Sequence, residues 1–242
     1  MEYDLSAGTI RANLGGKYLE SGQYVISNII RPILQSFILP FYGIKTLHGA
    51  VLTKGERTIL LTGRGGADKT TTAAQLMRAG YDILSDDGPF FFTDGNHAYA
   101  LSSLDYLHLT ENTLRLFPEL KERTVGVRDH REKFAVRMSE LPNSGAWKQP
   151  LRITHYIQLQ RRREVAVPRV EKINRHLIHR TLLDESMIIF RRAPFRASAD
   201  TFRQYSEFIF DLLAKVVQGA ETFELTFADQ HLREIPALLE QI

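Results

Sequence analysis

Hydrophobic and polar residues alternate along this chain in short segments, a pattern that indicates several strands joined by a few helices. Residues 57–62 form an apolar run with β-branched members and predict a buried strand. Residues 69–79 contain good helix formers without glycine or proline, so they predict a helix that Gly80 ends. Residues 81–85 predict the next strand. The central order is therefore strand, glycine-rich turn, helix and strand.

The rest of the chain predicts a mixture of hairpins, strands and helices around this block. Residues 24–44 are the most apolar stretch, and isoleucines at helical spacing, Ile30 and Ile38 among them, predict an amphipathic helix that covers a core. The remaining expected elements are hairpins at 8–24 and 89–101, helices at 111–117, 170–185 and 200–217, strands at 133–138, 153–160 and 222–227, an exposed loop at 121–132 and a terminal helix.

The turn between the central strand and helix has the residues of a phosphate-binding loop. Residues 63–70 read Gly-Arg-Gly-Gly-Ala-Asp-Lys-Thr and match G-x-x-x-x-G-K-[ST] at every required position except Asp68. In such loops backbone N–H groups hold phosphates, the lysine reaches the outer phosphates and the hydroxyl residue holds Mg²⁺. The sequence thus predicts a nucleotide site made by Gly63, Gly65, Gly66, Ala67, Asp68, Lys69, Thr70 and Thr71, with Thr70 as a metal ligand.

Asp68 places a carboxylate where the loop pattern requires glycine. A carboxylate about 5 Å from one phosphate charge, at an effective dielectric constant of about 20, is repelled by about 3 kcal/mol. Mg²⁺ and Lys69 would screen part of this repulsion, which leaves a penalty of about 1–3 kcal/mol, or about ten- to a hundredfold in affinity. A side chain that faces away from the phosphates, or one that helps to hold a metal ion, would remove the penalty.

Asp86 and Asp87 end the strand that follows the predicted helix. Two carboxylates at a strand end beside a phosphate loop suit Mg²⁺ binding and proton transfer. We expect Asp86 to hold the metal ion and Asp87 to accept a proton, and a simple Asp-Asp-Gly turn is the alternative. Later in the chain, Lys133 is a further candidate for contact with the outer phosphates. The alternative is that Lys133 is a solvent-facing strand residue.

Together, His48-Gly49, the loop ending in Lys69-Thr70, and Asp86-Asp87 resemble the HPr kinase/phosphorylase family and its relatives. The resemblance covers residues 44–93. Those proteins share a nucleotide-binding core with ATP-dependent phosphoenolpyruvate carboxykinases. The resemblance implies the use of ATP and Mg²⁺. It also implies that His48 is an active-site partner and that Asp87 is the base that takes the proton from a serine hydroxyl.

This resemblance completes the expected architecture. It implies an α/β fold with a mixed sheet, a nucleotide-binding core of the HPr kinase/carboxykinase type, antiparallel hairpins and C-terminal helices. Residues 1–43 would form an N-terminal hairpin and helix packed on that core, and residues 44–242 the nucleotide-binding domain.

Two departures from the family limit the expected activity. One is Asp68, and the other is the absence of a later Glu-x-Arg-Gly type of signature that engages HPr. The acceptor is therefore expected to be a serine or similar hydroxyl of another peptide or protein. A catalytically impaired relative that serves as a binding or scaffold module is the alternative, and an enzyme of the carboxykinase kind ranks lowest.

Composition and charge narrow the compartment and the partners. The chain has 242 residues and no cysteine, which excludes disulfides and thiolate metal sites, and its start lacks the features of a signal peptide. We therefore expect a cytoplasmic protein without a transmembrane segment, with membrane-surface binding of residues 24–44 as a minor alternative. Net charge is only +3, but arginines gather between residues 161 and 196. They indicate either a solvated surface or an acidic peptide partner, and no nucleic-acid motif accompanies them. The oligomeric state is left open, with a homo-oligomer as one option.

Overall fold

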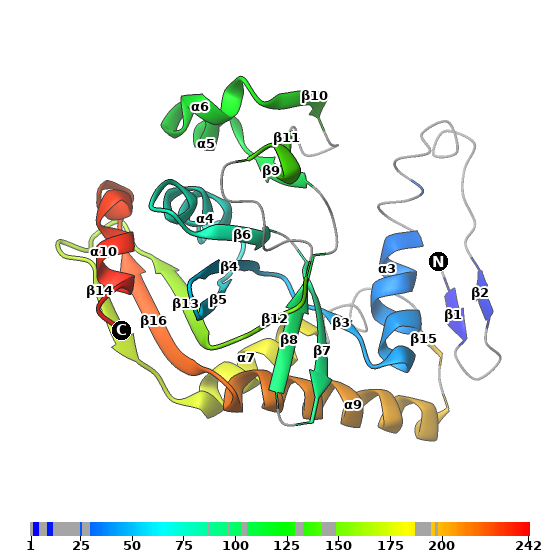
Figure 1. Ribbon diagram of the computed structural model, residues 1–242. Helices are drawn as coiled ribbons and strands as arrows, with labels where there is room; N and C mark the ends of the chain where they lie inside the picture. Colours follow the sequence, from blue (N-terminus) through cyan, green and yellow to red (C-terminus); the bar gives the residue numbers. More distant parts are fainter. Residues whose placement is uncertain are drawn as a thin grey trace.

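The protein is described by a computed structural model, drawn in Figure 1. It describes residues 2–4, 9–11, 25, 30–86, 88–95, 97–102, 106–128, 133–141, 149–186, 195–196 and 198–242. The described residues form a mixed α/β structure that is built on a central six-stranded sheet.

The central sheet has the strand order β14-β16-β13-β5-β4-β6. These strands are β4 (Ala50–Lys54), β5 (Arg57–Thr62), β6 (Asp82–Ser85), β13 (His155–Arg161), β14 (Arg169–Lys172) and β16 (Glu221–Phe227). Strand β13 is parallel to both β5 and β16, whereas the other pairs are antiparallel. Because β4 is antiparallel to both β5 and β6, those two strands run in the same direction as β13 and β16.

The described residues also form three smaller sheets. The first has the order β12 (Leu151–Arg152), β8 (His97–Leu101), β7 (Phe90–Asp94) and β3 (Lys45–Thr46). The second joins β10 (Thr124–Arg128), β11 (Phe134–Arg137) and β9 (Tyr106–Leu109). The third joins β15 (Phe195–Arg196), β1 (Glu2–Asp4) and β2 (Thr9–Arg11).

The helices are mostly short. The α-helices are α3 (Arg31–Ile33), α4 (Lys69–Arg78), α5 (Glu111–Leu116), α6 (Pro118–Lys121), α7 (Arg175–Ser186), α9 (Ala199–Gln218) and α10 (Ile235–Leu239). The described residues also contain a π-helical segment, η2 (Leu34–Ile38), and the 3₁₀ segments η3 (Leu39–Tyr42), η4 (Met138–Glu140) and η6 (Asp229–Glu234).

Both faces of the central sheet are covered. Alternate residues of β5 point to opposite sides, so Ile59 and Leu61 join one core cluster and Leu60 joins the other. The first cluster includes α4 and α10, and the second includes α9 with strands β7 and β8. Figure 1 shows α4 on one side of the sheet and the long α9 on the other. A strand that is buried on both faces reads as a continuous apolar run, as β5 does.

Much of the pattern-based reading is confirmed. The structure contains the predicted β5, α4 and β6, the β7–β8 hairpin, and the later strands β11, β13 and β16. Helix α9 closely matches the predicted range 200–217. The turn of the predicted hairpin at 8–24 lies outside the described residues.

Three predictions were wrong in part. Ile30 and Ile38 were expected to face a core, but their exposed fractions are 44% and 39%. The helical segment changes from α to π to 3₁₀ geometry, so a constant spacing no longer keeps residues on one face. Residues 169–172 form strand β14 on the edge of the central sheet, so the following helix begins only at Arg175. Within the expected loop 121–132, β-branched residues form β10, which pairs with β11.

Within the described residues, none of the helices combines the length and the apolar character that crossing a membrane requires.

Lys45 is an unusual member of the interior. It is only 4% exposed, and its Nζ donates a hydrogen bond to the Tyr205 hydroxyl on α9 at 3.2 Å. No carboxylate pairs with it among the residues that the structure describes. Burial lowers the pKa of the Lys45 ammonium to about 8. The folded protein therefore binds this proton less well than the unfolded chain does.

Replacing Lys45 by methionine is expected to stabilise the protein by about 1–3 kcal/mol at pH 7, because a buried charge disappears while the volume is kept. The pKa of Lys45 lies near 8 in the folded protein, against 10.5 for an ordinary lysine, so the penalty is complete below pH 8 and fades as pH rises toward 10.5. Urea unfolding of both proteins at pH 7 and pH 9.5 measures this. A gain that is equal at both pH values would contradict the assignment to lysine charge.

Candidate phosphate-binding site

Polar segments gather at one edge of the central sheet, where four strands end. Strand β5 leads into the loop 63–68, β6 leads to Asp86, β13 ends at Arg161 and β16 is followed by Asp229. Strand β4 runs the opposite way, so it begins at this edge just after His48. The strand order therefore brings five segments that are far apart in the sequence to the same side of the sheet.

The loop after β5 has a tightly constrained backbone. A Cβ atom on Gly63 would lie 2.8 Å from the Ala67 Cβ and 3.0 Å from the Leu159 carbonyl oxygen, so only glycine fits there without a shift. The Ala67 N–H donates to the Arg64 carbonyl at 3.0 Å and closes a turn. Helix α4 then begins at Lys69, with its first N–H groups at the loop, where a helix attracts anions.

Lys69 is folded back into the loop. Its exposed fraction is 8%, and its Nζ donates to the Gly63 carbonyl oxygen at 2.7 Å. The ammonium group is thus held next to the backbone that would surround a phosphate. A lysine in this position supplies positive charge to a bound anion after a small movement of its side chain.

Asp68 has a left-handed backbone at the position where the loop pattern has glycine. Its φ and ψ are 60° and 34°, and it is the single non-glycine residue with positive φ among those the structure describes. This left-handed conformation costs an ordinary residue about 1–2 kcal/mol, and aspartate is among the residues that tolerate it best. Glycine at this position would therefore relieve backbone strain as well as remove the carboxylate.

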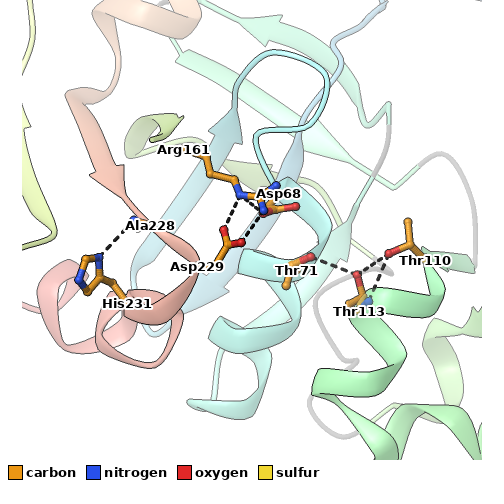
Figure 2. A network of polar contacts seen from close by, with 8 residues as sticks. All are labelled: Asp68, Thr71, Thr110, Thr113, Arg161, Ala228, Asp229 and His231. Atoms are coloured by element: carbon orange, nitrogen blue, oxygen red, sulfur yellow. Dashed lines mark hydrogen bonds and ion pairs between the residues drawn. The ribbon is translucent and has the colours of Figure 1, made fainter. Parts of the chain in front are cut away.

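The Asp68 carboxylate forms an ion pair with Arg161. Its Oδ2 lies 2.9 Å from the Arg161 Nε. The same guanidinium also donates to both carboxylate oxygens of Asp229, at 2.5 Å from Nε and 2.6 Å from Nη2. Figure 2 shows Arg161 with both aspartates around it. We call these three residues the Asp68–Arg161–Asp229 cluster.

The cluster shifts the ionisation of its members in opposite directions. The pKa of Asp68 is raised, chiefly by burial; the Arg161 charge offsets part of this rise, and the Asp229 charge adds to it. The hydrogen bond from Arg161 lowers the pKa of Asp229 and raises that of Arg161 itself. Sequence analysis placed Arg161 only in a basic run and did not select Asp229. Their positions were the available signal, since Arg161 is the last residue of β13 and Asp229 lies two residues after β16.

A cavity of about 530 Å³ opens beside the loop and the cluster. Its lining combines carboxylates, hydroxyls, arginines and apolar side chains: Asp68, Thr71, Thr110, Asn112, Thr113, Arg115, Leu116, Arg161, Phe227, Asp229 and Leu232. Thr110 caps α5 by accepting a hydrogen bond from the Thr113 N–H at 3.2 Å. The Thr113 hydroxyl lies 3.1 Å from that of Thr71 and links α5 to α4 (Figure 2). These hydrogen bonds join residues of α4 and α5 that line the cavity.

The other predicted site residues occupy varied environments. Asp86 is 4% exposed, and its Oδ2 accepts a hydrogen bond from the His108 N–H at 2.9 Å. His48 is exposed, whereas Thr70 and Lys133 are partly exposed. Asp87 lies outside the described residues.

The described residues offer a limited donor set for Mg²⁺. None of them form a group of three or more histidine, aspartate or glutamate side chains around a common point. A hydroxyl such as Thr70 and one carboxylate such as Asp86 suit Mg²⁺, since this ion usually takes few protein ligands together with phosphate and water. The chemistry of these two groups is compatible with a nucleotide-bound metal ion.

Replacing Gly63 by alanine is expected to destabilise the protein by about 1–3 kcal/mol, because the added methyl group would collide with Ala67 and the Leu159 carbonyl. Alanine at Gly65 is the matched control, since nothing lies within 4 Å of its added Cβ. Thermal unfolding of the two variants checks this. Equal melting temperatures would show that the loop relaxes without cost.

Comparison with known proteins gives a distant likeness in fold. No protein-family model matches the chain, and no curated protein matches it. Among solved structures, the chain is similar to the Hpr(Ser) kinase/phosphatase from Coxiella burnetii, with 12% identity over 81% of this chain and 95% of that chain, and a TM-score of 0.38. Because this likeness is so distant, it does not indicate an activity, and the function is inferred from the residues of the chain itself.

Proposed function

We propose that this protein is an ATP-dependent phosphotransferase that acts on a serine or similar hydroxyl of a peptide or protein other than HPr. The observation that carries the proposal is the position of Lys69, whose ammonium lies on the Gly63 carbonyl inside a glycine-rich loop at the start of α4. A phosphate bound by the loop would replace this contact with a stronger one, because the ammonium donor and the phosphate acceptor are both charged. The proposal includes a nucleotide-binding core of the HPr kinase/carboxykinase type within residues 44–242.

The phosphates of ATP would bind the backbone of residues 63–68 and the first turn of α4. Lys69 would contact the outer phosphates, and Thr70 and Asp86 would hold Mg²⁺, which supplies charge neutralisation for the transferring group when bound. The nucleoside would occupy the neighbouring cavity, which Asp68 and Thr71 join to the loop. Its volume lies within the range typical of small-molecule sites.

His48 and Asp87 would act on the acceptor. His48 lies just before β4, at the sheet edge that also carries the loop, and Asp87 follows Asp86 in the sequence. Asp87 would accept the hydroxyl proton as the acceptor oxygen attacks the terminal phosphorus, and His48 would orient the acceptor. Lys133, next to β11, would add a further positive charge for the phosphates.

An acidic peptide fits the charge near the loop. Arg162 and Arg163 are exposed directly after β13, which ends at this edge. Exposed arginines of this kind bind carboxylates and guide anionic partners. The proposed compartment is the cytoplasm, where ATP is present.

A second candidate function is a nucleotide-free binding or scaffold module. The specific observation in its favour is Asp68, which stands in the loop where the pattern has glycine and carries a negative charge. Titration with Mg-ATP separates the two candidates, since the module would bind no nucleotide in the loop.

Replacing Lys69 by alanine is expected to weaken Mg-ATP binding about ten- to a hundredfold, because one charge-assisted contact to phosphate is lost. Isothermal titration calorimetry measures the affinity. Lys54→Ala is the matched control, because Lys54 ends β4 at the opposite edge of the sheet and pairs there with Glu240. Unchanged affinity in the Lys69 variant would refute phosphate binding by the loop.

Replacing Asp87 by asparagine is expected to reduce phosphoryl transfer about 10²–10⁴-fold while nucleotide affinity stays nearly the same, since a general base acts on the acceptor. Transfer of the γ-phosphate from labelled ATP to an array of serine-containing acidic peptides provides the readout. Asp94→Asn, at the exposed end of β7, serves as the control. Full turnover in the Asp87 variant would remove this residue from the mechanism.

A further inference from the structure

The Asp68–Arg161–Asp229 cluster places a positive charge next to a carboxylate of the proposed phosphate-binding loop. The backbone at residue 68 has to be left-handed so that the loop can enter α4, and the Asp68 carbonyl accepts the first helical hydrogen bond, from the Thr72 N–H at 2.8 Å. The side chain of Asp68 is therefore attached to a fixed point beside the loop. Its carboxylate needs a counter-charge if polyphosphate is to bind there.

Arg161 supplies that counter-charge from a neighbouring strand. It is the last residue of β13, which lies beside β5 in the sheet, and its Nε is 2.9 Å from the Asp68 Oδ2. The side chains of Arg161 and Asp68 are similarly protected, with 31% and 30% exposed. Their attraction is therefore screened less than that of a fully exposed pair.

Asp229 fixes the direction of Arg161. It contacts two nitrogens of the guanidinium, and this bidentate arrangement limits rotation of the planar group. The Asp229 side chain is 65% exposed, so solvent screens its own charge far better than that of Asp68. The charge of Arg163 also acts on Asp229 and lowers its pKa, so the two aspartates have two arginines around them.

We infer that Arg161, positioned by Asp229, makes Asp68 compatible with phosphate in the loop by pairing with its carboxylate and holding it toward the cavity wall. This inference rests on the proposed nucleotide binding and deepens it. Arg161 and Asp229 are thereby positioning residues, whose effect on the ligand passes through Asp68. They are needed only because residue 68 is not glycine.

The test is a double-mutant cycle on Mg-ATP affinity, measured by calorimetry with the full chain. Arg161→Met is expected to weaken binding about ten- to a hundredfold, because it exposes the phosphates to an unpaired carboxylate. In the Asp68→Gly background the same change is expected to alter affinity less than about threefold. Asp229→Asn should give a smaller loss that Asp68→Gly also removes.

Two further measurements separate this role from other effects. Inorganic tripolyphosphate, which has no nucleoside, is the second probe. Its affinity should fall by the same factor on Arg161→Met, because the unpaired Asp68 carboxylate acts on the phosphates. Arg233→Met is the control for loss of one positive charge, because Arg233 is exposed on η6, the segment that also holds Asp229. Melting temperatures of the free variants report whether each one folds.

The outcomes distinguish this inference from the proposed function. An equal loss in both backgrounds would overturn it and make Arg161 a direct ligand contact. Binding by Asp68→Gly but not by the natural chain would also overturn it, while leaving the loop as a phosphate site. No binding by any variant, Asp68→Gly included, would overturn the proposed function together with this inference.

Discussion

The parallel alignment of β5, β13 and β16 is the constraint on which the candidate site depends. Parallel strands end at the same edge of a sheet. There β5 is followed by the loop, β13 ends in Arg161, and β16 is followed by Asp229. The alignment is held by burial on both faces, with α4 on one side and α9 on the other. A slip of one residue between β5 and β13 would turn their apolar side chains to the wrong faces and would separate Arg161 from Asp68.

The loop combines features that attract and features that repel an anion. The start of α4 and the Lys69 ammonium attract it, whereas the Asp68 carboxylate repels it until Arg161 pairs with that group. Lys69 and Arg161 differ in origin, because one belongs to the loop and the other reaches it across the sheet. The charge that a phosphate would meet therefore depends on tertiary structure as well as on the loop sequence.

Sequence reasoning was most successful where one local signal dominated. The apolar run of β5, the glycines of the loop and the helix formers of α4 are adjacent in the chain, so their order could be predicted together. The ion pair between Asp68 and Arg161 could not, because it requires the pairing of β5 with β13. The left-handed backbone of Asp68 was equally hidden, since a motif lists residue types and not dihedral angles. The exposed Ile38 shows that helical periodicity fails where the helix changes its geometry.

The presence of aspartate in this left-handed position also has a genetic consequence. Every aspartate codon differs from a glycine codon by a single base, so the full loop motif lies one point mutation away from this chain. That mutation would relieve the backbone strain and remove the negative charge from the loop in one step. It would also leave Arg161 with Asp229 as its remaining partner in the cluster.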